Sequence, residues 1–191
     1  LQFIKNPTVT AGPDALICDD SEYLLIDANA TNYSNVIWLS SGDGTFSNVN
    51  DVNPIYTPGP NDIANQTPIT LTLTTVPIFP CASGPSSSMT LSFEQATTVD
   101  VGDNRLVCEG SALPINLTDG VDATNATGFT WSTSGTGTFT NPNIIDPVYT
   151  PSDADINGGI PITLTLTANP TSPCVLDVSD SFDLTVVKNP T

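Results

Sequence analysis

The chain has 191 residues, enough for one large domain or for two small ones that each bury a modest core. Twenty acidic residues face only three basic ones, so the formal net charge is −17, and such a surface repels phosphate backbones and anionic lipid. The composition therefore argues against nucleic acid as a partner. Direct membrane insertion is not predicted either, because no apolar run approaches the roughly eighteen residues that a span requires.

Short strands separated by turn residues are predicted along the whole chain. Clusters of Pro, Gly, Asn, Asp, Ser and Thr recur about every eight to twelve residues, and helical periodicity is missing, which is typical of a β-sandwich. In the clearest strand Ile69, Leu71 and Leu73 alternate with threonines, so one face is apolar and the other polar. The predicted strands of the first half are 8–11, 15–18, 23–30, 36–39, 44–47, 54–57, 69–76 and 89–94.

The second half of the chain repeats the first. From Trp38 onward the sequence returns at an offset of 93 residues, so that "SGDGTFSN" at 41–48 matches "SGTGTFTN" at 134–141. Before the tryptophans the offset is 90 residues, which places a three-residue insertion in a surface loop. We therefore predict an all-β protein of two tandem immunoglobulin-like β-sandwich domains with about seven strands each.

Both ends of the chain also fit the repeat. "KNPT" occurs at 5–8 and again at 188–191, and "LQFI" at 1–4 corresponds to "LSFE" at 91–94. We expect 1–4 to be the last strand of a preceding repeat, 5–94 and 95–187 to be two whole repeats, and 188–191 to begin a following one. The parent protein would then hold at least four modules.

Four cysteines divide evenly between the repeats, with Cys18 and Cys81 in the first and Cys108 and Cys174 in the second. This division suggests disulfides, which persist in oxidising compartments and predict a protein outside the cytoplasm. Zinc is disfavoured because there is no His and no CxxC pair. Bridges within each module are the favoured connectivity. A bridge between modules, such as Cys18 with Cys174, stays open as an alternative.

Two aromatic pairs recur at matching positions and are predicted to lie in the core. Trp38 and Trp131 sit centrally in a strand, where a large indole would fill the space between two sheets. Tyr56 and Tyr149 occupy a short strand before a loop that begins with proline. We expect them to pack inward, with the hydroxyl bonded to nearby backbone.

Acidic loops make calcium the metal to consider. Hard cations prefer oxygen-rich loops, and the candidates are Asp100 and Asp103 near the junction of the repeats and Asp153 and Asp155 in the loop after Tyr149. None of them matches the spacing of a known calcium loop. For Asp155 and its counterpart Asp62, closing a turn is the favoured role. No other cofactor is predicted.

No catalytic site is predicted. Without His there is no ordinary triad base and no thiol–imidazole pair, and the usual ligand sets for a catalytic zinc-bound water are missing. Asp43 in "SGDGTF" looks suited to a ligand, but the second copy has Thr136 at that position. A shared catalytic Asp is therefore not expected.

The chain resembles the immunoglobulin-like or PKD-like tandem repeats of giant surface adhesins of Bacteroidota, of the gliding-motility type exported by the type IX system. The resemblance lies in "AGPDALICDDSEYLLIDANATN" at 11–32, "WSTSGTGTF" at 131–139, "YTPSDADI" at 149–156 and the "ITLTLT" strand followed by "PC". It implies an extracellular location, tandem assembly and no enzymatic activity, and it supplies no ligand residues.

Two functions follow as expectations. The first is a structural repeat of a large cell-surface protein, an adhesin stalk or filament, whose partners are neighbouring repeats and like chains. The second is a glycan- or protein-binding module that uses the variable loops 29–36 and 119–128. This second function requires exposed aromatics in those loops, and Tyr33 and Phe129 are the candidates.

Overall fold

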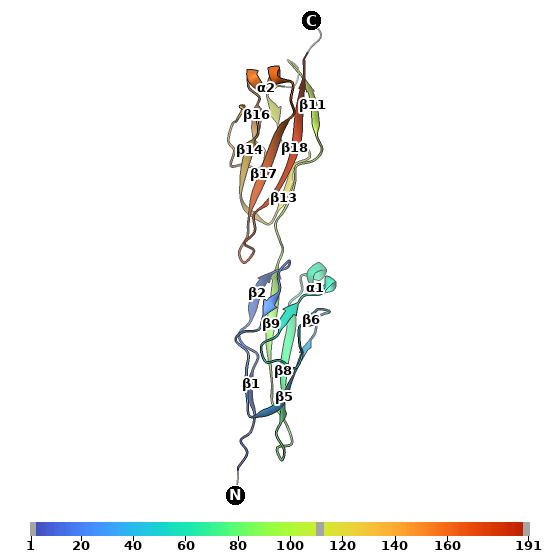
Figure 1. Cartoon of the computed structure of the whole chain (residues 1–191), viewed down its shortest axis with the longest axis vertical. Coiled ribbons are helices and arrows are strands. Elements are labelled where there is room, and N and C mark those ends of the chain that lie inside the picture. The colour runs from blue at the N-terminus through green and yellow to red at the C-terminus, as the bar shows by residue number, and fades with distance from the viewer. Residues whose placement is uncertain (1–2, 110–112, 189–191) are drawn as a thin grey trace. The chain divides into compact units, whose positions relative to one another are not determined.

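The computed structural model describes residues 3–109 and 113–188 and divides the chain into two compact units, Leu1–Gln95 and Ala96–Thr191 (Figure 1). The division falls one residue beyond the predicted boundary between the repeats. Phe3 and Ile4 lie in irregular backbone, and residues 1–2 and 189–191 lie outside the described ranges. The assignment of both ends to neighbouring repeats stays a prediction.

Among residues 3–95, the part of the first unit that the structure describes, there are nine strand segments and one short helix. They are β1 (Thr8–Thr10), β2 (Ala15–Cys18), β3 (Tyr23–Leu24), β4 (Asn29–Thr31), β5 (Tyr33–Ser40), β6 (Thr45–Phe46), β7 (Ile55–Thr57), α1 (Pro60–Asn65), β8 (Ile69–Pro77) and β9 (Ser86–Glu94).

The second unit repeats this order in its described residues. Its elements are β10 (Thr98–Asp100), β11 (Arg105–Cys108), β12 (Ile115–Asn116), β13 (Asp122–Thr124), β14 (Ala126–Thr133), β15 (Thr138–Phe139), β16 (Val148–Thr150), α2 (Asp153–Gly158), β17 (Ile162–Pro170) and β18 (Val178–Val187).

Each unit is an immunoglobulin-like β-sandwich. In the first unit one sheet has the order β2-β9-β8-β5, and the opposite layer is built from β1-β4 and β3-β7-β6. Taken with β1 and β2 as one interrupted strand and β3 and β4 as another, these segments are the seven strands of an immunoglobulin-like domain in their usual order. The second unit has the matching sheets β11-β18-β17-β14, β10-β13 and β12-β16-β15.

Two local features differ from the sequence-based prediction. The predicted strand 23–30 is broken between β3 and β4, where the amide of Asn53 donates to the carbonyls of Leu25 at 2.6 Å and of Ala28 at 3.0 Å. Those carbonyls therefore bond to a side chain instead of a neighbouring strand. The helices α1 and α2 were not predicted, since six residues are too few to show helical periodicity.

The core of each unit is formed by residues that alternate along the long strands. Along β8 the buried positions Ile69, Leu71 and Leu73 alternate with threonines, as the period-two pattern predicts. Trp38 is 1% exposed and Trp131 is 3% exposed, so both indoles lie between the sheets. Tyr56 and Tyr149 are fully buried beside them.

The chain enters each unit at one pole and leaves it at the other, as Figure 1 shows. In the first unit we call the end that holds Asn6 and the loop 78–85 the N-terminal pole, and the end that holds Cys18, α1 and Glu94 the C-terminal pole. The second unit has its loop 171–177 at the N-terminal pole and Cys108, α2 and Val187 at the C-terminal pole. In the described ranges, neither helix is long enough to cross a membrane.

Candidate functional site

Polar residues that recur in both units gather at the corner between the short central strand and the helix. In the first unit this corner, which we call the helix corner, comprises the loop 41–44, Tyr56 and the start of α1. Pro60 stands at the first position of α1, where a missing N–H costs nothing, and Asp62 stands in its first turn. The helix thus begins where the sequence supplies its start signals.

Asp62 organises the helix corner. Its carboxylate is 5% exposed and accepts four hydrogen bonds: from the backbone N–H of Asp43, Gly44 and Gly59, each at 3.1 Å, and from the hydroxyl of Tyr56 at 2.7 Å. Because these donors fill the carboxylate oxygens, the charge is stabilised without a counter-ion. Asp62 therefore has the structural role that the sequence favoured over metal ligation.

Asp43 accepts a second set of hydrogen bonds, from the first turn of α1. Its carboxylate accepts from the N–H groups of Asn61 and Asp62, both at 3.1 Å, and from the Asn61 side chain at 2.8 Å. These bonds satisfy N–H groups at the start of α1, and they hold the pKa of the Asp43 carboxyl below its usual value although desolvation pushes it upward. Asp43 is a helix cap.

In the second unit different residues satisfy the N–H groups at the start of the helix. There Ser152 caps α2 by accepting from Asp155 N at 3.1 Å, and the Asp155 carboxylate accepts from Thr136 N at 2.8 Å and Ser152 N at 3.0 Å. Burial opposes ionisation of Asp155, but these hydrogen bonds outweigh it and lower the pKa of its carboxyl. At the position of Ser152 the first unit has Gly59, where an added Cβ would lie 2.2 Å from Asp43 Oδ1. Each helix is thus capped by one side chain: Asp43, from the loop 41–44, caps α1, and Ser152, the residue just before the helix, caps α2.

The hydroxyls of the two buried tyrosines hydrogen-bond to side chains of the helix corner and of the long strands. Tyr56 bonds to Asp62 and to Ser40, the latter at 2.9 Å, and Tyr149 bonds to Thr133 at 3.0 Å. The prediction of a bond to nearby backbone was therefore incomplete, because side chains are the main partners. Burial raises the pKa of Tyr56 to about 12, and the bond to the Asp62 carboxylate adds to the shift while the Ser40 bond opposes it. The neutral phenol is the stable form.

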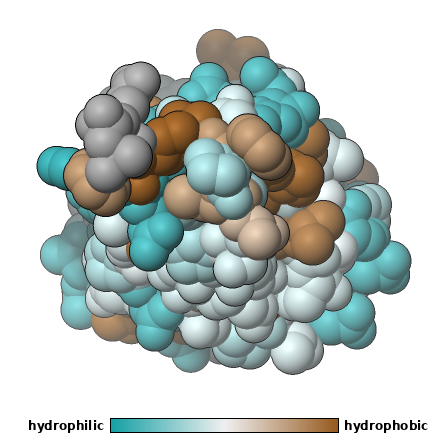
Figure 2. Space-filling view, turned by 90° about the horizontal axis from the view of Figure 1, so that it is seen from below, coloured by the Kyte–Doolittle hydropathy of each residue, from teal (hydrophilic) through white to brown (hydrophobic). Residues whose placement is uncertain are grey.

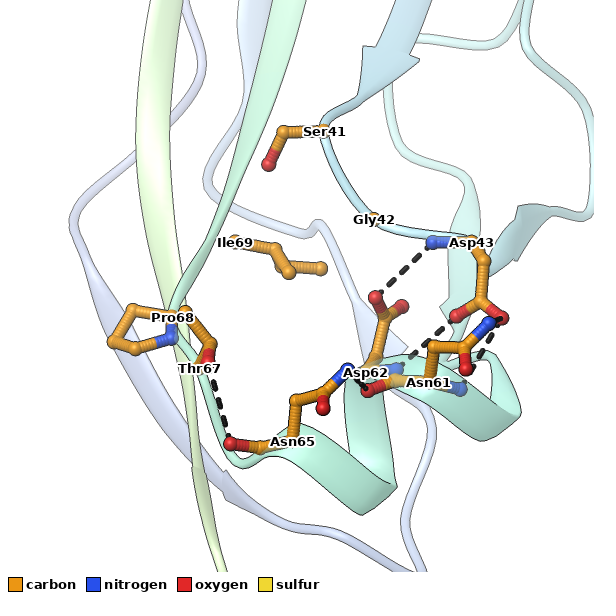
Figure 3. Close-up of a pocket in the computed structure, with 9 residues that line it drawn as sticks. All are labelled: Ser41, Gly42, Asp43, Asn61, Asp62, Asn65, Thr67, Pro68 and Ile69. Atoms are coloured by element: carbon orange, nitrogen blue, oxygen red, sulfur yellow. Dashed lines mark hydrogen bonds between the residues drawn. The ribbon is translucent and has the colours of Figure 1, made fainter.

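Beside α1 the surface of the first unit is hollowed into an open depression of about 590 Å³. Figure 3 shows Asn61 turned toward Asp43, and Asn65 and Thr67 at the opposite side. The matching depression of the second unit is only about 120 Å³ and has Ala154, Gly158 and Ile160 at the corresponding positions. The full lining in the first unit is Ser41, Gly42, Asp43, Asn61, Asp62, Asn65, Thr67, Pro68 and Ile69.

The calcium candidates are spread over different elements. Asp100 ends β10 and accepts from Gly102 N at 2.8 Å, Asp103 is exposed in the following turn, and Asp153 is exposed at the start of α2. Asp155 gives its oxygens to the helix corner. In residues 3–109 and 113–188 no three acidic or thiol side chains gather closely enough to hold a metal ion. Calcium binding at these residues stays a hypothesis.

The predicted disulfides within each module are wrong. Cys18 and Cys174 are disulfide-bonded, whereas Cys81 and Cys108 carry free thiols. Cys18 pairs with Glu94 at the end of β9, while Cys81 precedes the start of that nine-residue strand. Nine residues of strand span about 27 Å, but bridged Cα atoms lie at most about 7 Å apart.

The second unit has the same arrangement. Cys108 pairs with Val187 at the end of the ten-residue strand β18, and Cys174 lies in the loop before that strand begins. The two cysteines of a module are therefore at opposite poles. The sequence placed Cys81 and Cys174 in loops but did not reveal at which pole those loops lie.

The aromatics proposed for ligand binding in the variable loops are only partly exposed. Tyr33 begins β5 and packs against the core of the first unit, and Phe129 lies in β14 and packs against the core of the second. Neither residue offers the open ring that a glycan-stacking platform needs.

Comparisons with known proteins place the chain in no family. No family model matches it, and no curated protein matches it. Among solved structures it is similar to the extracellular cadherin domains 3–6 of protocadherin gamma B2, with 11% identity and a TM-score of 0.46 over 94% of this chain. The chain spans about half of that structure, 47% of its length.

Two further solved structures show a likeness of the same degree. A three-immunoglobulin-domain structure of titin has 12% identity and a TM-score of 0.46, and the match covers 96% of this chain and 66% of that one. Domains EC1–2 of human protocadherin-24 have 11% identity and a TM-score of 0.45, and the match covers 98% and 100%. The immunoglobulin-like assignment rests on the strand order of each unit.

Proposed function

We propose that the chain is a non-catalytic structural segment of a large extracellular surface protein, in which tandem modules form a stalk or filament. Disulfide bonding at Cys18 and Cys174 supports an oxidising compartment, and the acidic surface supports solubility there. The residues shared by both modules build strands, core and corner. Neighbouring repeats are the partners expected for such a segment.

The observation that carries this proposal is the pairing of the terminal strands within each module. β2 runs parallel to β9, from Ala15 with Leu91 to Cys18 with Glu94, and β11 runs parallel to β18 in the same register. The chain enters at one pole and leaves at the other. Tension along the chain therefore loads all the hydrogen bonds of this ladder in shear at once, and they must break together.

Force spectroscopy of the 191-residue chain tests the proposal. We expect two unfolding events of similar force, one for each module. N–H groups alternate in direction along a strand, and the N–H of Asp19 donates to Glu94 O, so the N–H of Ile17 also faces β9. Ile17→Pro removes this N–H from the ladder and should lower the force of one event, with the second module as internal control.

The result is compared with the equilibrium stability of the same variant. A mechanical role of the parallel ladder predicts that the unfolding force falls by more than the loss in free energy of unfolding explains. An unchanged force, or a smaller fall, would contradict that role.

The depression beside α1 favours a second candidate function, the binding of a glycan through hydroxyl and amide groups. Asn61, Asn65 and Thr67 line it in the first module, whereas the second module has Ala154, Gly158 and Ile160 there. A glycan array probed with the chain, and with a variant that carries the second module's three residues, tests this function. Binding that survives the exchange would refute the site.

A further inference from the structure

Exposed apolar side chains occur at the N-terminal pole of the first module, onto which Figure 2 looks, and also along β5, an edge strand of its four-stranded sheet. The chain enters the module at that pole, so in the proposed stalk a preceding repeat is the expected neighbour there. Along β5 the side chains of Ile37 and Leu39 point to the outer face of the sheet, and Leu39 is 63% exposed. The strand thus carries an apolar strip of its own.

The middle of the β5 edge is closed by the chain segment that follows β6. Trp38 N donates to the carbonyl of Val49 at 2.9 Å. The side chain of Asn50 donates to the carbonyl of Val36 at 2.8 Å. Edge strands are commonly protected in such ways, because their outward N–H and C=O groups can otherwise pair with a strand of another chain.

At its C-terminal end the β5 edge is open. There β6 pairs with β7 in the opposite layer instead of with β5. Ser41 N donates to Thr70 O in β8, and main-chain groups alternate in direction along a strand, so the N–H and C=O of Ser40 face away from β8. An open depression of about 370 Å³ lies at this end and is lined in part by Leu39, Ser40, Phe46 and Val49. Outward main-chain groups and apolar side chains therefore meet at one opening.

Acidic side chains flank this depression. Asp43 stands between two glycines that line it, and Asp51 lies two residues after Val49; both carboxylates are exposed. Hydrogen bonds from the start of α1 hold the pKa of the Asp43 carboxyl below its usual value, so this group is ionised at neutral pH. In the sequence of the first module the only basic residue is Lys5. The charges therefore attract a cationic ligand and repel an anionic one.

The second module has the same edge without these features. Trp131 N donates to the carbonyl of Pro142 at 2.8 Å, so the chain closes the middle of the β14 edge in the same way. At an offset of 93 residues, however, the two outward apolar residues and the two acidic residues are replaced by Thr130, Ser132, Thr136 and Ile144. A role in building the repeat would require these features in both modules, whereas a ligand site can be confined to one.

We propose that the open end of β5 binds an extended, basic peptide segment of another protein. The segment adds to the sheet as a short strand beside Ser40, whose N–H donates to it and whose carbonyl accepts from it. An apolar side chain of the segment enters the depression between Leu39 and Val49, and its basic side chains approach Asp43 and Asp51. Since the contact is small, binding at a single site is weak and reversible.

Titration of the isotope-labelled 191-residue chain with a synthetic peptide of alternating lysine and valine tests the site by NMR. We expect the amide signal of Ser40 to shift and its hydrogen exchange to slow, while the signal of Thr133, its counterpart in the second module, stays unchanged. Shifts spread evenly over both modules, or an unaffected Ser40, would overturn the proposal.

Two altered peptides separate the main-chain bonds from the charges. A peptide of the same sequence with methylated main-chain N–H groups cannot donate to β5 and should bind several-fold more weakly. A peptide with glutamate in place of lysine should not bind, because its charge matches that of the module. Equal affinity of the methylated and unmethylated peptides would refute strand addition.

Variants of the chain test the residues of the site. Leu39→Ser introduces the residue that the second module has, and we expect about ten-fold weaker peptide binding, as for the loss of one buried aliphatic contact. Ile26→Ser is the matched control, since Ile26 is 69% exposed and lies outside the depression, and it should leave binding unchanged. Asp51→Asn should weaken binding at low salt but not at high salt. Equal weakening by Leu39→Ser and Ile26→Ser would refute the site.

Sedimentation of the chain alone, under reducing conditions, tests whether a second copy is the occupant instead. We expect a monomer at every concentration, because two such acidic chains repel each other. A dimer that Leu39→Ser abolishes would assign the open edge of β5 to a second copy and overturn the proposal. None of these outcomes depends on the force measurement, so this proposal and the mechanical one can fail separately.

Discussion

The replacement Asp62→Asn should destabilise the first module more than any other single polar change at the helix corner. The variant keeps the size of the side chain but removes its charge and one acceptor oxygen. Three donors converge on Oδ2, from Gly44, Gly59 and Tyr56, and one donor from Asp43 meets Oδ1. The asparagine oxygen can replace only one of these acceptors.

The magnitude follows from the bonds that change. Hydrogen bonds to a charged acceptor are about twice as strong as neutral ones, so three bonds weaken by a few tenths to about 1 kcal/mol each. If the new amide faces the N–H of Asp43, that partly buried donor loses its acceptor at a cost of about 1–2 kcal/mol. We expect the free energy of unfolding of the first module to fall by about 3–4 kcal/mol, a large share of the ~5–15 kcal/mol typical of a domain.

Urea unfolding followed by NMR measures this loss for each module separately. The indole N–H of Trp38 donates to Val52 O in the first module, and that of Trp131 donates to Ile145 O in the second, so the two signals report the two cores. Asp155→Asn is the matched control and should cost less, because Asp155 is more exposed. Equal losses for the two variants, or a loss below about 1 kcal/mol for Asp62→Asn, would refute the reasoning.

Three further outcomes are expected. Folding lowers the pKa of the Asp155 carboxyl below its ordinary value of 3.8, so the ionised form stabilises the second module above that pH. This stability is lost as the pH falls through the folded pKa. The urea midpoint of the second module should therefore drop below pH 4, and it should change less with pH in Asp155→Asn. Gly59→Ser should destabilise the first module because its Cβ would crowd Asp43, and adding Asp43→Thr should restore much of the loss, as a double-mutant cycle by thermal unfolding will show. Arg105→Ala removes a guanidinium 4.6 Å from the ring centre of Phe182 and should cost the second module about 0.5–1 kcal/mol in urea, with the first module unaffected.

Much of the fold could be predicted from the sequence because its signals are local. The alternation along 69–76 fixes which face of β8 is buried, and the predicted strand 15–18 coincides with β2. The helix α1 was missed since it lacks an apolar stripe. Pro60 and Asp62, at its first and third positions, are start signals that could have indicated it.

The disulfide connectivity and the capping network could not be predicted in the same way. Spacing along the chain does not show that Cys18 and Cys81 lie at opposite ends of a strand, because that depends on which strands pair in parallel. Likewise, the change from Asp43 to Thr136 looked like the loss of a ligand. Only the position of Gly59 opposite Asp43 shows that the pair Asp43 and Gly59 is replaced as a unit by Thr136 and Ser152 in the second module.

The two forms of the helix cap constrain the order in which the repeats diverged. A module with both Asp43 and a serine at 59 would be crowded, whereas one with Thr at 43 and Gly at 59 merely lacks a cap, which costs about 1 kcal/mol. Divergence through the uncapped intermediate is therefore the easier route between the two present forms. In a collection of such modules the residues at these two positions should vary together, so that Asp occurs with Gly, and Thr occurs with Ser.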